Sequence, residues 1–128
     1  FLVHPEALSF AAAVNLGIRA AKTSHVCLLN NDMEIEPGFF AALRRAFDRV
    51  PDLFCATAQI FFPTGQRRQE TGKAVYWPAD PRDLPLRCLE PLPGENDSPV
   101  LYGSGGCSLF DTAKLRAIGC LKESFRPA

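Results

Sequence analysis

The chain has 128 residues, of which 47% are hydrophobic and 22% charged, and this supplies apolar material for one buried core. Fourteen lysines and arginines balance fourteen aspartates and glutamates, so the net charge is zero. A chain without a basic excess has no general attraction for nucleic acid or an anionic membrane. Its longest apolar runs fall well short of the roughly 20 residues that cross a bilayer, so we expect no transmembrane segment.

The first half of the chain predicts two helices with a strand between them. Residues 5–22 are rich in alanine and have apolar residues at helical spacing, which predicts a helix capped by Ser9. The run HVCLL, 25–29, predicts a buried strand of a parallel sheet. Pro37 predicts the start of a second helix that continues to Val50. One apolar face of this helix is formed by Phe39, Phe40, Leu43, Ala46 and Phe47. The order helix, strand, helix indicates a layered α/β fold.

The second half is predicted to be richer in β-structure. Residues 55–62 form a strand candidate, a turn follows at 63–65, and 66–77 is the candidate return strand. Residues 78–99 hold six of the eleven prolines and predict a long loop, a feature that often serves as a functional lid. A glycine-rich turn, an apolar run and a short helix follow, and the helix is expected to start at Asp111 and stop at Gly119.

Five cysteines, at positions 27, 55, 88, 107 and 120, show no spacing typical of a zinc site. Cys27 and Cys107 lie inside apolar runs, where a free cysteine usually behaves as a small buried hydrophobe. An odd, unpatterned set favours structural thiols in a reducing, cytosolic compartment.

The segment LLNNDMEIEPGFF, 28–40, runs from a predicted strand into amides and carboxylates before the next helix begins. Ligands of open α/β sheets bind beyond the carboxyl ends of strands, and Mg²⁺ or Mn²⁺ is commonly held by one or two carboxylates plus substrate phosphates. Asp32 and Glu34 are therefore candidate ligands of a metal–diphosphate site. A turn that leads into the helix explains the same residues equally well.

Three segments, AAAVNLGIRAA (11–21), HVCLLNNDMEIEPGFF (25–40) and YGSGGCSLFDTAKLRAIG (102–119), resemble the middle of a family two glycosyltransferase. The resemblance implies a partial GT-A fold, which is Rossmann-like, with a mostly parallel sheet, flanking helices and a β-rich acceptor side. It implies one partial domain over 1–128. Residues 1–50 would be its donor- and metal-binding part, and 51–128 its acceptor-side part with the loop 78–99.

The resemblance also implies site residues. The family's Asp-x-Asp motif falls on Asn30, Asn31 and Asp32, which makes Asp32 the ligand of Mg²⁺ or Mn²⁺ and places Asn30 near the donor's ribose or sugar. Asn31 joins the donor-binding set, and Glu34 is either a second metal ligand or a surface acid. Asn15 belongs to the family's N-x-G signature beside the donor site. The alternative is that Asn15 bonds only to backbone and that Gly17 allows close packing.

The loop Ser104, Gly105 and Gly106 resembles the place where the family binds the acceptor and the donor's sugar; a plain turn is the alternative. The function implied is inverting transfer from a nucleotide sugar, UDP- or dTDP-linked, to a glycan or lipid-linked acceptor. The setting expected is bacterial cell-surface polysaccharide synthesis in the cytoplasm, including the inner face of the membrane. The nucleotide-base strands and the catalytic base are expected before Phe1 and beyond Ala128, so the isolated chain is expected not to catalyse transfer. A nucleotidyltransferase of similar fold and a non-catalytic interaction domain are the alternatives.

Overall fold

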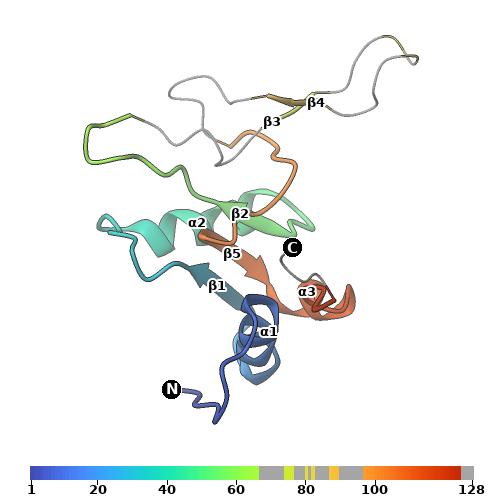
Figure 1. The fold of residues 1–128 in the computed structure, drawn as a ribbon. Coiled ribbons are helices and arrows are strands. Elements are labelled where there is room, and N and C mark those ends of the chain that lie inside the picture. The colour runs from blue at the N-terminus through green and yellow to red at the C-terminus, as the bar shows by residue number, and fades with distance from the viewer. Residues whose placement is uncertain (67–73, 77–79, 81, 83–86, 90–96, 125–128) are drawn as a thin grey trace.

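A computed structural model describes residues 1–66, 74–76, 80, 82, 87–89 and 97–124 (Figure 1). Its elements, in chain order, are α1 (Phe10–Ala20), β1 (His25–Leu29), α2 (Phe39–Arg49), β2 (Cys55–Thr57), β3 (Ala74–Tyr76), β4 (Arg87–Leu89), β5 (Cys107–Asp111) and α3 (Thr112–Ala117). The mixture of helices and strands confirms the predicted α/β class.

Among the described residues, three strands form the main sheet in the order β1-β5-β2, and both pairings are antiparallel. Leu29 is opposite Cys107 in the first pairing, and Cys55 is opposite Phe110 in the second. The prediction of a mostly parallel sheet is therefore wrong for the strands described. The run HVCLL is apolar because helices cover both faces of the sheet, and such cover does not require parallel neighbours.

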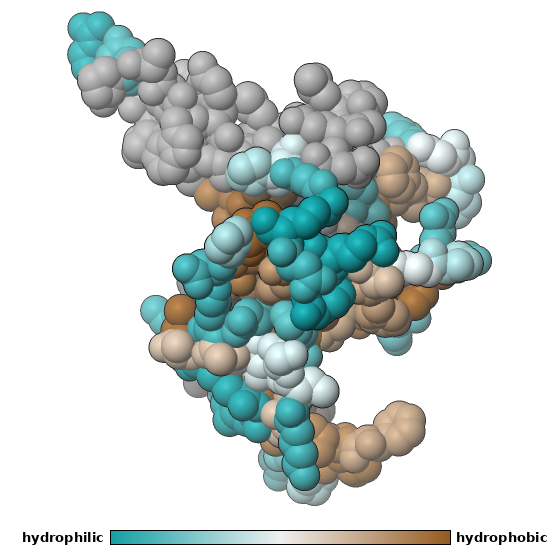
Figure 2. Space-filling view, turned by 180° about the vertical axis from the view of Figure 1, so that it is seen from behind, coloured by the Kyte–Doolittle hydropathy of each residue, from teal (hydrophilic) through white to brown (hydrophobic). Residues whose placement is uncertain are grey.

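Helices lie on the two faces of this sheet (Figure 1). On one face, Phe110 of β5 packs with Ile18 of α1 and Leu115 of α3 in the hydrophobic core. On the other face, the ring of His25 meets that of Phe47 of α2 edge to face, with centroids 4.4 Å apart. Figure 2 views the molecule from behind and shows hydrophilic side chains gathered at the centre of that face.

Local capping signals are confirmed. Ser9 is the N-cap of α1, because its Oγ accepts from the N–H of Ala12 at 3.3 Å, although the helix begins at Phe10 rather than at residue 5. Asp111 caps α3 by accepting from the N–H of Lys114 at 2.9 Å, and Gly119, with φ of +88°, follows its end.

The second helix differs in detail from its prediction. It begins at Phe39, two residues after Pro37, with Gly38 at its N-cap in the left-handed conformation. Of its predicted apolar face, Leu43 is buried, whereas Phe40 is 50% exposed. The apolar face of α2 therefore extends beyond the part of the helix that packs against the sheet.

The region between β2 and β5 is only partly described. The strand predicted over 55–62 ends at Thr57, and the predicted turn is confirmed by a bond from the N–H of Phe62 to the carbonyl of Gln66 at 2.8 Å. Within the predicted return strand, β3 pairs antiparallel with β4 and not with β2. The loop prediction for 78–99 is therefore wrong at 87–89, and most of its remainder lies outside the described residues.

Four cysteines, Cys27, Cys55, Cys107 and Cys120, carry free thiols, and Cys107 is buried while the other three are half-buried. The side chain of Cys88 lies outside the described residues. Among the helices of the described residues, none is long and apolar enough to cross a membrane.

Candidate functional site

The two loops that the sequence singles out lie side by side at one end of the sheet. Since β1 and β5 are antiparallel, the residues that follow β1 are next to those that precede β5. The backbone N–H of Asn30 donates to the carbonyl oxygen of Gly106 at 2.9 Å. The side chain of Asn30 lies over the same glycine, because a Cβ atom added to Gly106 would be 3.2 Å from Asn30 Nδ2.

The acidic residues of the first loop, Asp32 and Glu34, follow Asn30 closely in the chain. The N–H of Met33 donates to the carbonyl of Asn30 at 3.4 Å, so the segment turns immediately after β1. Asn31, Asp32 and Glu34 are exposed. Within the described residues, Asp32 and Glu34 make no hydrogen bond or ion pair, and no three His, Cys, Asp or Glu side chains gather into a metal-binding group. Their carboxylates are therefore open to an external partner.

A cluster of hydroxyl groups on Thr57, Ser104 and Ser108 connects the second loop to β2 and β5. The Oγ of Ser108 donates to Thr57 Oγ1 at 2.8 Å, and the N–H of Ser104 donates to the same oxygen at 3.3 Å. The N–H of Gly106 in turn donates to Ser104 Oγ at 3.2 Å. Ser108 is fully buried. Thr57 and Ser108 were not predicted as site residues. The available signal was a hydroxyl residue inside each of two apolar runs, since a hydroxyl group that becomes buried needs a hydrogen-bond partner.

The glycines of this loop differ in how much room they have. A Cβ atom on Gly103 would be 2.6 Å from Cζ of Phe110 and 3.0 Å from the Sγ of Cys55. The corresponding atom on Gly105 would be 3.5 Å from Cζ of Phe10, which is ordinary contact. Phe10 is 61% exposed, so an open aromatic ring lies beside the glycine loop. Phe10 was predicted to lie in a helix and was not predicted as a site residue.

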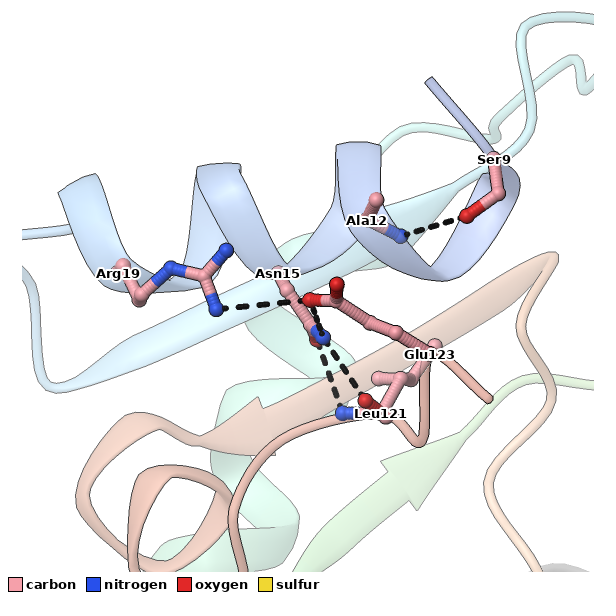
Figure 3. Close-up of polar contacts among 6 residues, drawn as sticks. All are labelled: Ser9, Ala12, Asn15, Arg19, Leu121 and Glu123. Carbon is pink, nitrogen blue, oxygen red and sulfur yellow. Dashed lines mark hydrogen bonds and ion pairs between the residues drawn. The ribbon is translucent and has the colours of Figure 1, made fainter. Parts of the chain in front are cut away.

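Asn15, the third predicted donor-binding residue, is 2% exposed on α1, and its side chain bonds to a distant part of the chain. Its carboxamide hydrogen-bonds to the backbone of Leu121 and to the side chain of Glu123, as Figure 3 shows. Asn15 does bond to the backbone of Leu121, as the alternative expects, but it bonds to the side chain of Glu123 as well. Its donor-binding role stays a prediction. Close packing does not explain Gly17, because a Cβ atom there would meet nothing within 4 Å.

The thiols near the site are poor nucleophiles. Burial raises the pKa of Cys27, Cys55 and Cys107, and the charge of Cys27 raises the pKa of Cys107 further. Because the thiolate is the reactive form, these residues stay in their unreactive state at neutral pH. This supports the interpretation of the cysteines as structural.

A cleft of about 320 Å³ lies at the opposite end of the sheet, lined among others by His25 and Asp111. Lys114 at its wall donates to the carbonyl of Leu53 at 3.2 Å and lies 3.6 Å from Asp52. The cleft is separate from the two loops, since it adjoins the start of β1 and the end of β5.

A family model described as glycosyl transferase family 2 matches residues 1–119. The chain belongs to this family. Family 2 glycosyltransferases have the GT-A fold and move a sugar from a nucleotide-sugar donor to an acceptor. This membership favours glycosyl transfer over the nucleotidyltransferase and interaction-domain alternatives. Neither a curated protein nor a solved structure matches the chain.

Proposed function

We propose that the loops 30–34 and 103–106 of this glycosyltransferase together form its donor site, and that the donor is a UDP- or dTDP-linked sugar. The observation that carries the proposal is the contact between Asn30 and Gly106. It places exposed carboxylates, a side-chain amide and a glycine-rich loop at one end of the sheet. These groups suit a ligand that has both a charged diphosphate and a sugar with hydroxyl groups.

The residues present fit a divalent cation that the substrate helps to bind. Asp32 is the proposed ligand for Mg²⁺ or Mn²⁺, with Glu34 as a second carboxylate, and both are exposed. Mg²⁺ typically takes one or two protein carboxylates and completes its coordination with substrate phosphates and water. We therefore expect the cation to bind well only together with the diphosphate.

Negative charge develops on the nucleoside diphosphate as its bond to the anomeric carbon breaks, and a divalent cation there supplies compensating charge. The acceptor hydroxyl forms the new bond to the anomeric carbon with inversion, and its proton passes to a general base. Asn30 offers amide donors to the donor's ribose or sugar, and Ser104 to Gly106 form the floor against which the sugar rests. Gly105 leaves room there because it has no side chain.

The wider setting is part of the same proposal. With zero net charge the chain has no basic field to hold a diphosphate, so a metal and local amides must do so. A glycan or lipid-linked acceptor, used in the bacterial cytoplasm for cell-surface polysaccharide, fits such a donor. For an acceptor carried on a lipid, we expect the enzyme at the inner face of the membrane.

Calorimetry tests the proposal with UDP, dTDP and Mn²⁺, each alone and in combination. Binding that needs both metal and diphosphate and is lost in Asp32→Asn is the expected result. Glu36→Gln is the matched control, because it removes an exposed acid of the same loop that has no proposed ligand role. A folded wild-type chain that binds neither diphosphate with Mn²⁺ would overturn the proposal, and so would equal binding by Asp32→Asn.

A further inference from the structure

The buried side chain of Asn15, in the middle of α1, hydrogen-bonds to the segment that follows α3 (Figure 3). The carboxamide of Asn15 accepts from the N–H of Leu121 at 2.9 Å and donates to the carbonyl of Leu121 at 2.8 Å. It also donates to Glu123 Oε1 at 2.8 Å. Both amide hydrogens of Asn15 are thus used within the chain, and neither is left for a ligand.

Further contacts support the same junction. Arg19, one turn beyond Asn15, lies 3.7 Å from Glu123 Oε1. The guanidinium of Arg116 on α3 donates to the carbonyls of Ile18 and Ala21, each at 2.6 Å. The end of α1, the helix α3 and the segment 121–123 are therefore joined as one unit.

The two residues that lead from α3 to Leu121 have a left-handed backbone conformation. Gly119 and Cys120 have φ values of +88° and +63°, and the left-handed region is costly for a residue with a Cβ atom. The N–H of Cys120 donates to the carbonyl of Leu115 at 2.9 Å, and the next residue is the one that Asn15 holds. The bonds of Asn15 thus help to maintain the reversal that brings the segment back to α1.

The same helix contacts the proposed donor loop at its other end. Phe10 begins α1 and lies against Gly105, and Asn15 is five residues further along, or about 7.5 Å at 1.5 Å per residue. We propose that Asn15 is a positioning residue for the proposed donor site. Its carboxamide fixes the segment Leu121–Glu123 at a set place relative to the donor loop and does not itself bind the donor. This inference rests on the proposed function, since the loop it refers to is the proposed donor site.

Paramagnetic Mn²⁺ provides the test, because it broadens the NMR signals of amides according to their distance from the metal. With Mn²⁺ and UDP bound, we expect defined broadening at Leu121 and Glu123 in the wild-type chain. Asn15→Ser should change that broadening at least twofold and raise hydrogen exchange at Leu121 at least tenfold. The affinity for Mn²⁺ with UDP should stay within twofold.

A second pair of variants covers the case in which Asn15→Ser does not fold. The side chain of Glu123 is 47% exposed, so Glu123→Ala should fold. Like Asn15→Ser, it should change the broadening and raise hydrogen exchange at Leu121. Glu123→Gln keeps the oxygen that accepts from Asn15 and should restore the wild-type broadening. Failure of Glu123→Ala to alter the broadening or the exchange at Leu121 would overturn the inference.

Two other results separate this inference from the proposed function. A tenfold loss of UDP affinity in Asn15→Ser with unchanged exchange at Leu121 would make Asn15 a donor ligand and refute positioning alone. A wild-type chain that shows no broadening and no UDP binding would refute the proposed function, and with it the positioning role of Asn15 toward the donor site. In that case the exchange measurements would still report on the junction itself.

Discussion

Asn30 donates its backbone N–H to the carbonyl of Gly106 at 2.9 Å, one residue beyond the last pair of the β1–β5 ladder. This bond continues the ladder into both loops of the proposed donor site. A change in one loop is therefore transmitted to the other through backbone as well as side chains.

Gly106→Ala should weaken the donor site with little effect on stability. The new methyl would be 3.2 Å from Asn30 Nδ2 and 3.6 Å from the Cε of Met33, so the side chain of Asn30 must shift. We expect the affinity for UDP with Mn²⁺ to fall about tenfold, or about 1.4 kcal/mol, by calorimetry. Gly17→Ala is the control, since Gly17 lies outside both loops and its methyl would meet nothing within 4 Å. Equal affinities in the two variants would contradict the proposed placement of Asn30.

Gly103→Ala should destabilise the fold. Its methyl would overlap the ring of Phe110, a core residue that is 6% exposed, and overpacking of this kind costs about 1–3 kcal/mol. Urea unfolding measures the loss. The prediction is wrong if the Gly103 variant unfolds at the wild-type urea concentration.

Gly17→Ala should do the opposite and stabilise α1 by about 0.5–1 kcal/mol, because Gly17 is at an open helix position. The same urea titration measures this gain.

Thr57→Val should also lower the free energy of unfolding. The substitution keeps the shape but removes the oxygen that accepts from Ser108 and Ser104, and Ser108 is fully buried. A buried donor left without a partner costs about 1–3 kcal/mol. Thr57→Ser retains the hydroxyl and should lose less than Thr57→Val in the same urea titration.

Arg116→Lys should loosen the end of α1. The guanidinium donates to the carbonyls of Ile18, Arg19 and Ala21, whereas an ammonium is a point charge that cannot reproduce this fork. Arg116 is exposed, so we expect a loss of only about 1 kcal/mol. Hydrogen exchange at Ala21, whose N–H donates to Gly17, should rise in this variant. Unchanged exchange at Ala21 would show that the fork does not hold the helix end.

Alkylation by iodoacetamide should report the raised pKa of three cysteine thiols. The ordinary value is 9.0, and the pKa of Cys27, Cys55 and Cys107 lies above it. At pH 8 these residues should react more slowly in the folded chain than in urea, as measured by mass spectrometry. The raised pKa also makes stability depend on pH. As the pH rises past 9.0, these thiols ionise in the unfolded chain before they do so in the folded chain, so the free energy of unfolding falls. Equal rates in folded and unfolded chains would refute this prediction.

Local signals in the sequence predicted local structure well. The strand 25–29, the caps Ser9 and Asp111 and the stop at Gly119 each depend on residues close in the chain. The direction of the sheet strands could not be predicted in this way. The partner of β1 is β5, far along the chain, and an apolar run does not encode the direction of its neighbour.

The same limit applies to the candidate site. Asn30 and Gly106 were each predicted from their own motif, but their contact follows only from the antiparallel pairing of β1 and β5. Thr57 and Phe10 carry no motif, because their roles come from contacts with a distant loop. Asn15 was predicted as part of a signature, yet its partners are at the far end of the chain.

The central place of β5 has a consequence for how the chain assembles. Within the described residues, both outer strands of the main sheet pair only with β5, so β1 and β2 lack that shared partner until Cys107–Asp111 has been synthesised. Contacts between such distant segments slow folding, although lengthening the connection between them adds little to the entropic cost of closing it. We therefore expect the emerging polypeptide to expose two unpaired apolar strands and to depend on chaperones until β5 arrives. Insertions at the turn 63–65, away from the proposed donor loop, should by contrast lengthen this connection without disturbing the sheet.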